Sequence, residues 1–370
     1  MQIRPTKALI NLSNLAENYS IITQYASPAK IIAVVKADAY GHGARQIVEK
    51  LNTLENPPCI YAAATVEEVI DLQNSFPLLR FLVFEPFNLN MAEALKQYDF
   101  EVTITSTDQL EMIESLNLSG ETGVHIKIDT GMGRLGFKEY EIDGLLKHLT
   151  GINKLSIKGV YTHFATSDGF DREFTLKQIE CFERVLSKFK EAGISTGIIH
   201  TSNTGAIINY PQAKYDAVRP GISLYGYYKD IETTVALGLK PVMSLVSTLS
   251  TVKKFKAGES ISYGRSFILE TDSWIGTVAA GYADGIRRSL SGKISCAIAG
   301  IEYPQVGTIT MDRFMVNLGE TEYPVGTVVT ILSDDLQFNA NCWEWCDKMD
   351  TIPYEITCGI SKRVPRVYEY

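Results

Sequence analysis

The sequence predicts an α/β fold in two domains, an N-terminal (β/α)8 TIM barrel over residues 1–233 and a mostly β C-terminal domain over residues 234–370. Strand-like and helix-like segments alternate eight times in about the first 230 residues, and such a barrel usually has about 250. After residue 233 the helical periodicity nearly disappears, and short alternating stretches separated by glycines replace it. A length of 370 residues also favours two domains over one.

The N-terminal part starts with a short apolar segment, Ala8–Ile10, and a helix expected over residues 11–25. The expected barrel strands follow at residues 31–37, 60–65, 79–84, 100–105, 124–129, 157–164, 198–203 and 217–225. Helices are expected between most of them, among them 66–73, 91–98, 108–116 and 172–192. From this pattern alone a doubly wound open sheet is the alternative. No GxGxxG motif follows the first strand, so a dinucleotide-binding fold has little support.

The C-terminal part is expected to be a β domain with one helix. Its expected strands are 242–252, 259–266, 274–280, 294–299, 305–310, 314–318 and 325–332, and the helix is 339–351. Cys342 and Cys346 are spaced to share one face of that helix. No further Cys or His lies near enough in sequence to complete a zinc site, so no metal is predicted.

Composition and charge exclude several classes of protein. A net charge of −8 argues against nucleic-acid binding, which needs a basic face. No apolar run approaches the roughly 20 residues of a membrane span. The six cysteines are scattered, and residues 1–5 lack the apolar region of a secretion signal. We therefore expect a protein of the reducing cytoplasm, with no membrane or nucleic-acid partner.

The stretch Ile31–Gly43 carries the first candidate for chemistry. Five apolar residues run directly into Lys36, and an ammonium in that position costs free energy unless it is paired, neutralised or used. A desolvated lysine loses its proton more easily and becomes a nucleophile that forms Schiff bases. The simpler alternative is a lysine whose stem packs while its head reaches water. Tyr40 and two nearby glycines favour a ligand site, because glycine lets backbone approach a ligand closely.

The other candidates are grouped by their expected position in the barrel. Barrel enzymes place their chemistry at the C-terminal ends of the strands, where Asp129, His163, Ser202, Asn203 and Arg219 are all expected. Singly, each has a simpler explanation: a buried imidazole, a loop charge, or a helix cap before residue 204. Their shared position at one rim favours a functional site.

Several motifs resemble those of the bacterial alanine racemases, which depend on pyridoxal 5′-phosphate (PLP). They are VVKADAYGHG, HIKIDTGMGRLG, THFATSD, HTSNTGA and VRPGISLYG. The resemblance implies that Lys36 carries PLP as a Schiff base. It also implies that the PLP phosphate is held by Tyr40, Ser202, Gly221, Ile222 and Tyr354, since fixed amides and hydroxyls must meet its charge.

The same resemblance gives roles to two cations of the fifth strand and its loop. Arg134 would sit near the PLP phenolic oxygen and the substrate carboxylate. Lys127 occupies a position that many family members carry as a carbamate supporting that arginine. The alternative is a lysine that pairs with Asp129 or another acid.

In this family an arginine, here Arg219, faces the pyridine nitrogen of PLP. A guanidinium has a pKa above about 12 and does not give up its proton, so the ring nitrogen stays unprotonated and the ring is a weaker electron sink. We expect this to favour racemisation over transamination.

The C-terminal domain resembles the family in GESISYGRSF, VGTITMD, GYADG and TIPYEITCGISKRVPR. Tyr263 would be the second base, facing L-alanine while Lys36 faces D-alanine, because racemisation needs a base on each side of the α-carbon. A chain from Tyr263 through His163 to Arg219 would favour the phenolate. In the family this tyrosine comes from the partner subunit, which implies a head-to-tail homodimer with two composite sites.

Three further residues of this domain gain roles by resemblance. The amide of Met311 would bind the substrate carboxylate, with Asp312 as support and Thr310 where a cysteine is common. Tyr282 would narrow the entrance. Tyr354 would limit the space for the substrate side chain, which favours alanine over serine.

The resemblance thus implies an isomerase that interconverts L- and D-alanine and supplies D-alanine for peptidoglycan. Three alternatives stay open: a racemase that also accepts serine, a related PLP decarboxylase, and a PLP-binding barrel without racemase activity. A decarboxylase needs a carboxylate at the ring nitrogen, which Arg219 opposes. A single-barrel PLP carrier lacks the β domain that this chain has.

Overall fold

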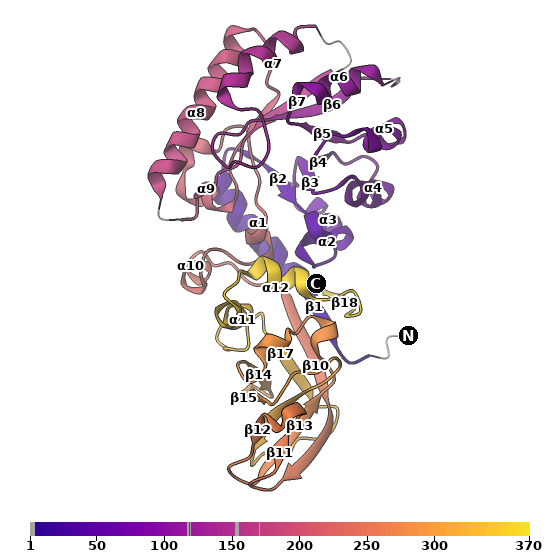
Figure 1. Cartoon of the computed structure of the whole chain (residues 1–370), viewed down its shortest axis with the longest axis vertical. Coiled ribbons are helices and arrows are strands. Elements are labelled where there is room, and N and C mark those ends of the chain that lie inside the picture. The colour runs from indigo at the N-terminus through magenta and orange to yellow at the C-terminus, as the bar shows by residue number, and fades with distance from the viewer. Residues whose placement is uncertain (1–3, 117, 119, 152–154, 170) are drawn as a thin grey trace. The chain divides into compact units, whose positions relative to one another are not determined.

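The computed structural model describes residues 4–116, 118, 120–151, 155–169 and 171–370 (Figure 1). The chain divides into two compact units. The barrel unit comprises Tyr19–Ala39 and Ala44–Leu224, and the sheet unit comprises the residues up to Asn18, Tyr40–Gly43 and Tyr225–Tyr370. The domain boundary expected between residues 233 and 234 stays a prediction.

The expected barrel is confirmed. Within the described residues, eight parallel strands close into a ring in sequence order, because β2 pairs with both β3 and β9. The strands are β2 Lys30–Val34, β3 Ile60–Ala63, β4 Phe81–Pro86, β5 Glu101–Ile104, β6 Thr122–Lys127, β7 Leu155–Tyr161, β8 Ile198–His200 and β9 Ala217–Val218. Their residues are mostly buried, as expected for parallel strands covered by helices.

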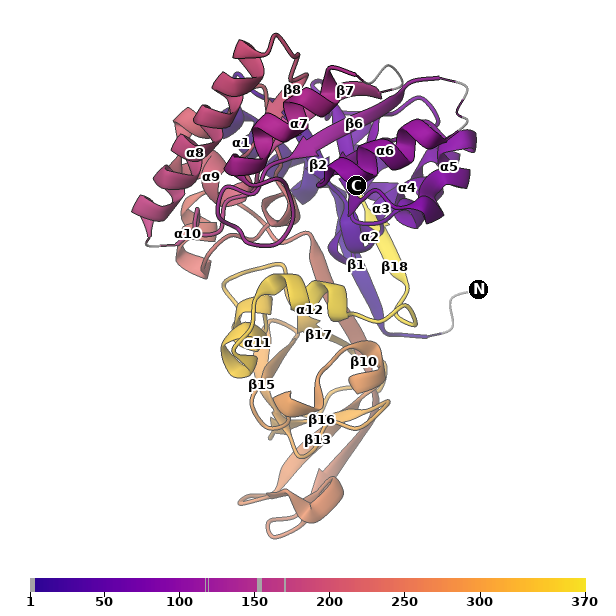
Figure 2. The same cartoon turned by 45° about the horizontal axis from the view of Figure 1, so that its top comes forward.

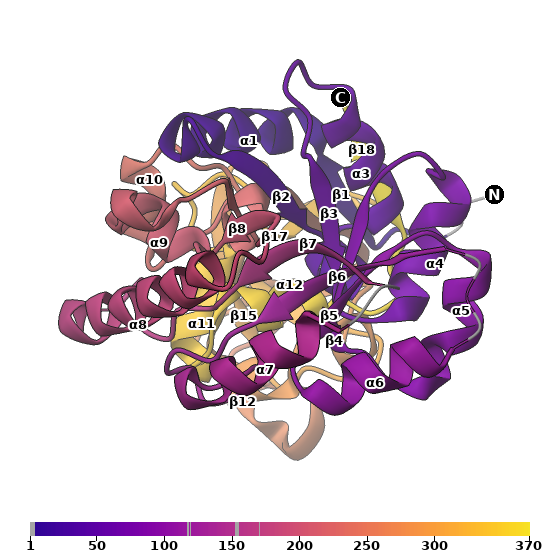
Figure 3. The same cartoon turned by 90° about the horizontal axis from the view of Figure 1, so that it is seen from above.

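Helices surround the strands of the barrel unit (Figure 3). They are α1 Leu12–Ala26, whose first turns belong to the sheet unit, α2 Lys36–Tyr40, α3 Ala44–Asn52, α4 Val66–Ser75, α5 Ala92–Gln97, α6 Thr107–Ser115, α7 Ile142–Leu149, α8 Arg172–Glu191 and α9 Thr204–Asn209. Short 3-10 turns lie at η1 Leu89–Met91, η2 Glu139–Glu141, η3 Pro211–Ala213 and η4 Ile222–Tyr225. Helix α8 has the broad apolar face that its sequence predicts, with Phe182, Val185 and Phe189 fully buried.

Seven of the eight barrel strands end before the expected residue, and two of these early ends change how the candidate site is built. The first ends at Val34, so Lys36 does not end a strand but begins the turn α2. The expected strand 217–225 has only Ala217 and Val218, because Pro220 lacks a backbone N–H and the chain then turns into η4. The apolar residues beyond both strands are buried against other elements, so their apolarity does not mark strand ends.

The expected β domain is also confirmed. Its sheet has the order β13-β16-β15-β14-β17-β10-β1-β18, and β13 pairs with β10 as well. Figure 2 shows β13 beside its partner β16. The strands of the sheet unit are β1 Lys7–Asn11, β10 Met243–Phe255, β11 Ser260–Ile261, β12 Phe267–Ile268, β13 Ser273–Val278, β14 Ser295–Ile298, β15 Ile301–Val306, β16 Phe314–Gly319, β17 Val328–Leu332 and β18 Arg366–Glu369. The N-terminal apolar segment thus forms β1, antiparallel to β10 and parallel to β18.

Helices of the sheet unit are α10 Ile231–Ala236, α11 Cys342–Met349 and α12 Pro353–Gly359, with 3-10 turns η5 Tyr263–Arg265, η6 Tyr282–Asp284 and η7 Arg288–Leu290. The helix expected over 339–351 begins only at Cys342, because the side chain of Asn341 caps it by accepting from the amides of Trp343 and Glu344. Cys342 and Cys346 are both buried on α11, as their spacing predicts. Helix α12 was not expected.

Among the described residues we find no helix with the length and apolarity that crossing a membrane requires.

Candidate active site

A left-handed turn follows Lys36. Ala37, Asp38, Ala39 and Tyr40 have φ values of 53°, 52°, 53° and 55°. Each such residue costs about 1–2 kcal/mol, because its Cβ approaches the following carbonyl oxygen. Backbone strain of this kind concentrates at functional sites. The turn therefore supports a functional role for Lys36.

Two carboxylates of the barrel unit hold this turn. Glu68 Oε1 accepts from the Ala37 amide at 2.6 Å, and Asp38 Oδ1 accepts from the Ala44 amide at 2.8 Å. Glu68 also caps α4 through its other oxygen, which fixes the carboxylate. The turn is thus tied to the starts of α3 and α4.

Arg219 is buried directly after β9 and is held on several sides. Its Nη1 donates to His200 O at 2.7 Å and lies 2.8 Å from His200 Nδ1. Its Nη2 donates to Thr162 O at 2.6 Å and to Thr201 O at 2.8 Å, and lies 3.4 Å from His163 Nδ1. Within the described residues, these bonds all start from the two Nη atoms of the guanidinium.

Positive charges gather around His163. Burial lowers the pKa of His163 well below its ordinary value, and the charges of Arg219, Lys127, Arg134 and Lys36 lower it further. This imidazole is therefore neutral at physiological pH. The same effects show that the structure brings the predicted barrel-unit residues Lys36, Lys127, Arg134, His163 and Arg219 close together.

Lys127 is a buried lysine without an ion pair in the described residues. Burial, followed by the charges of Arg219 and Arg134, lowers its pKa to about 7. Its Nζ lies 4.5 Å from the centroid of the Tyr161 ring. Asp129 bonds instead to Lys138 Nζ at 2.6 Å, so the alternative in which Lys127 pairs with Asp129 is wrong.

Ser202, Gly221 and Ile222 lie near the same rim of the barrel unit. Ser202 Oγ donates to Ala213 O at 2.6 Å. The helix cap before residue 204 is Asn203, whose Oδ1 accepts from the Ala206 amide, so the capping explanation for Ser202 is wrong. Ile222 opens η4 and Gly221 directly precedes it, and the first amides of a helical turn have no acceptor inside it.

Tyr40 and Tyr354 belong to the sheet unit and lie side by side. Their ring centroids are 5.7 Å apart, and Tyr40 is buried. Burial and the neighbouring Tyr354 raise the pKa of Tyr40, so its hydroxyl stays protonated and can donate. A phosphate oxygen is a suitable acceptor for that hydroxyl.

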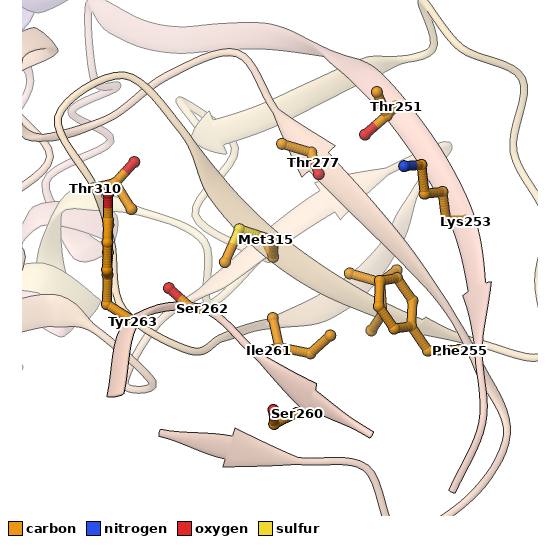
Figure 4. Close-up of a pocket in the computed structure, with 11 residues that line it drawn as sticks. Thr251, Lys253, Phe255, Ser260, Ile261, Ser262, Tyr263, Thr277, Thr310 and Met315 are labelled. Atoms are coloured by element: carbon orange, nitrogen blue, oxygen red, sulfur yellow. The ribbon is translucent and has the colours of Figure 1, made fainter. Parts of the chain in front are cut away.

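Tyr263 stands at a pocket of about 470 Å³ in the sheet unit (Figure 4). Its side chain is 74% exposed. Ile261 and Met315 lie between Tyr263 and Phe255 in this view. Ser262, Gly264 and Arg265 all have positive φ, so the chain turns tightly around the tyrosine, and the strand expected over 259–266 is interrupted there by η5.

Tyr282, Thr310 and Met311 are brought together by a close backbone approach. The Tyr282 amide donates to Thr310 O at 2.9 Å, and the Ala283 amide donates to Met311 O at 3.0 Å. A Cβ at Gly281 would lie 2.3 Å from Thr310 O, so only glycine fits there. Asp312 pairs with Arg363 at 2.5 Å, which holds the pKa of its carboxyl below the ordinary value.

Four polar residues of the barrel interior were not expected as site residues: Glu101, His125, Tyr161 and His200. The Tyr161 ring stacks on His200 at 4.7 Å between centroids. His125 and His200 stand inside the motifs HIKIDTGMGRLG and HTSNTGA, and Glu101 is a charged residue on a buried strand. Alternation along β6 places His125 on the same side as Lys127, which is the sequence signal that could have found it.

The residues present fit PLP. The aldehyde of the cofactor reacts with an amine, its phosphate accepts hydrogen bonds from amides and hydroxyls, and its ring nitrogen accepts one from a donor. Lys36 in its strained turn, the opening amides of η4 and the Nε–H of Arg219 provide such groups.

Comparison with known proteins identifies the family. Residues 10–229 match the N-terminal domain of alanine racemase, and residues 242–368 match its C-terminal domain. The chain is 39% identical over 377 aligned residues to alanine racemase 1 of Clostridium acetobutylicum, covering 99% of this chain and 96% of that protein.

Solved structures agree. Alanine racemase from Bacillus anthracis with bound L-Ala-P superposes with a TM-score of 0.91 at 33% identity, covering 100% of this chain and 96% of the other. Alanine racemase from Streptomyces lavendulae superposes with a TM-score of 0.92 at 29% identity, covering 100% and 98%. The chain therefore belongs to the alanine racemase family, whose members are PLP-dependent isomerases.

Proposed function

We propose that this protein is an alanine racemase that interconverts L- and D-alanine by a two-base mechanism and supplies D-alanine for peptidoglycan. The observation that carries the proposal is Lys36, which begins a strained left-handed turn and lies among the charges around neutral His163 and fixed Arg219. PLP, when bound, supplies an electron sink that acidifies the hydrogen on the α-carbon of the amino acid.

The two bases are Lys36 and Tyr263. The Lys36 amine takes or returns the α-proton on the D-alanine face, and the Tyr263 phenol does so on the L-alanine face. His163 links Tyr263 to the Arg219 cation in this proposal, and the chain of the three residues favours the phenolate form of Tyr263. Burial lowers the pKa of Arg219 to about 10, so this guanidinium is still a cation at neutral pH and keeps its proton. A donor that cannot protonate the ring nitrogen favours racemisation over transamination.

The remaining residues bind and orient. Arg134 and the Met311 amide bind the substrate carboxylate, Asp312 supports that loop through Arg363, and Tyr282 narrows the entrance. The phosphate is held by Tyr40, Ser202, Gly221, Ile222 and Tyr354. Tyr354 also limits the side-chain space, so alanine is preferred over serine.

Lys127 carries a carbamate in this proposal. A pKa of about 7 leaves much of the amine neutral at physiological pH. The amine nitrogen attacks the carbon of CO2, a proton leaves, and the resulting anion is attracted by Arg134 and Arg219. Labelling with ¹³C-bicarbonate and ¹³C NMR would detect the new carbonyl carbon, and its absence would leave Lys127 as a neutral amine.

The active site is composite, with Tyr263 supplied by the partner in a head-to-tail homodimer. Support comes from the exposure of Tyr263 beside a pocket whose lining includes Ile261, Phe255 and Met315. A catalytic phenol needs shielding from water, and a second copy of the chain would provide it. All six cysteines lie in the described residues and no disulfide joins them, which is consistent with the reducing cytoplasm as the place of work.

The test adds L-alanine to the purified full chain with PLP and follows optical rotation. We expect decay to zero, and no decay with Lys36→Ala. Borohydride should abolish the visible absorption band of the wild type and leave the reduced cofactor covalently attached to the chain, and it should attach no cofactor to Lys36→Ala. Gas release in place of racemisation would indicate a decarboxylase, and no change in rotation with PLP bound would indicate a carrier.

A further inference from the structure

We propose that Glu101 and His125 are positioning residues that orient Arg219 through His200, by setting which nitrogen of each histidine carries the proton. The inference rests on the proposed role of Arg219 at the ring nitrogen of PLP. It concerns a line of polar side chains in the barrel interior, away from the residues assigned to PLP or substrate.

The line runs across three strands. Glu101 on β5 accepts at 2.6 Å from His125 Nε2 on β6. His125 Nδ1 lies 2.8 Å from His200 Nε2 on β8. His200 Nδ1 lies 2.8 Å from Arg219 Nη1. Both histidines are fully buried, so water does not substitute for any of these bonds.

The residues at the two ends of the line determine which ring nitrogen of each histidine carries its proton. Glu101 only accepts and Arg219 only donates. His125 must therefore carry its proton on Nε2, facing the carboxylate, which leaves Nδ1 as an acceptor. His200 must then carry its proton on Nε2 as well, which leaves its Nδ1 free to accept from Arg219.

Only one arrangement of neutral rings satisfies every bond. An additional proton on either histidine would place two donors face to face at 2.8 Å. Burial lowers the pKa of both histidines, and Arg219 lowers it further at His200, in agreement with neutral rings. Burial alone would raise the pKa of Glu101, but the bonds from His125 and Arg80 outweigh it, so the carboxylate stays ionised.

The barrel wall leaves room for this line. A Cβ at Gly159 on β7 would lie 2.4 Å from His125 Nδ1, and a Cβ at Gly123 on β6 would lie 3.1 Å from Glu101 Cγ. Tyr161 stacks on the face of the His200 ring. Glycine at position 159 is therefore required by the ring of His125 and also by the carbonyl oxygen of Ile198, which a Cβ would meet at 2.8 Å.

The consequence for the reaction is positional. If the order of protons were reversed, His200 Nδ1–H would point at Arg219 Nη1–H, and the guanidinium would move away. Its Nε–H would then no longer point toward the proposed position of the PLP ring nitrogen. Glu101 thus acts on Arg219 without touching substrate or cofactor.

A single substitution and its partner test the inference. Arg80 also only donates, and it bonds Glu101 Oε1 from Nη2 at 2.6 Å and from Nε at 2.9 Å. In Glu101→Gln, Arg80 takes the amide oxygen, so the amide NH2 turns toward His125 and reverses the order of protons. In the double variant Arg80→Met/Glu101→Gln the amide can rotate and again accept from His125. Both variants lack the carboxylate charge, and they differ in amide orientation and in the Arg80 cation.

The first readout is ¹⁵N NMR of the PLP-loaded full chain with labelled histidine, of which the sequence has five. We expect the proton on Nε2 for both His125 and His200 in the wild type, on Nδ1 in Glu101→Gln, and on Nε2 again in the double variant. A proton on Nδ1 of His200 in the wild type would overturn the inference without any variant having to fold. Unchanged tautomers in folded Glu101→Gln would also overturn it.

The second readout is kinetic. We expect kcat to fall about ten- to a hundredfold in Glu101→Gln, with KM for L-alanine within about twofold, and to recover most of the loss in the double variant. Glu67→Gln, on the exposed side of α4, is the matched control. A double variant as slow as Glu101→Gln would contradict the inference. If the wild type binds PLP but does not racemise alanine, the proposed function fails, while the tautomers still decide whether the line of protons exists.

Discussion

At the scale of single residues, the barrel rim joins cations that repel one another. Lys127, Arg134 and Arg219 all act on His163, and Lys127 has no carboxylate partner in the part of the chain that the structure describes. Much of this site could be predicted from the sequence. The motifs contain the residues that carry the chemistry, and the expected strand order places these residues at the C-terminal end of the barrel. The buried line from Glu101 to His200 could not be predicted, since a histidine in a motif does not reveal what its second nitrogen contacts.

Stability should depend on pH through Lys127. Its pKa is about 7 when folded and about 10.4 in the unfolded chain, so the unfolded state binds more protons between these values. Stability therefore rises with pH across this window, by at most about 1.4 kcal/mol per pH unit, and the full penalty is present below pH 7. Lys127→Met should be more stable than the wild type at pH 7, with a gap that shrinks by pH 9. Urea unfolding in CO2-free buffer measures it, with exposed Lys158→Met as control, and a gap independent of pH would contradict the pKa shift.

The reaction should depend on the proton of Arg219. Arg219→Glu should raise transamination relative to racemisation by about tenfold or more, because a carboxylate stabilises a protonated ring nitrogen. Arg219→Lys keeps a cation but loses the planar fork, so racemisation should fall with no gain in transamination. Pyridoxamine phosphate and D-alanine are measured together. An unchanged ratio in Arg219→Glu would refute the assigned role.

At the scale of elements, strand starts could be predicted better than strand ends. The apolar run 31–35 and the run 217–225 both continue past the barrel strands, because their last residues pack beyond the sheet and not in it. The left-handed turn after Lys36 could not be predicted from the sequence pattern, because alanine, which stands at two of its positions, does not favour positive φ. The strain of such a turn is offset by favourable interactions elsewhere in the fold.

Glycine should relieve this turn. Ala37→Gly removes most of the left-handed strain of about 1–2 kcal/mol, and the greater entropy of the unfolded chain takes back about 0.5–1 kcal/mol. The free energy of unfolding should therefore rise by about 0.5 kcal/mol. Ala94→Gly, inside right-handed α5, should instead lower it by about 1 kcal/mol. Urea unfolding of both variants gives the two signs, and a loss of stability in Ala37→Gly would contradict the account.

At the scale of the whole molecule, the proposed homodimer predicts complementation. Lys36→Ala and Tyr263→Phe should each be inactive, but a mixed dimer would have one site with both defects and one with none. Dissociating and re-associating an equal mixture should restore about a quarter of wild-type activity. Mixing without dissociation is the control. No recovery, with mixed dimers shown to form, would mean that both bases come from one chain.

The two-domain architecture was predictable because helical and strand periodicities differ along the chain. The place of residues 7–11 was not, since their partners stand more than 200 positions later, in β10 and β18. Local patterns hold no information about such distant pairing.

That pairing has a consequence for how the protein is made. The first strand emerges from the ribosome early, yet its neighbours β10 and β18 are translated more than 200 residues later, and β18 has β1 as its only strand partner in the described sheet. During synthesis residues 7–11 must wait with their backbone hydrogen bonds unmet by protein. A C-terminal domain expressed without the preceding barrel would accordingly lack β1, and its last strand, β18, would have no strand partner in the sheet.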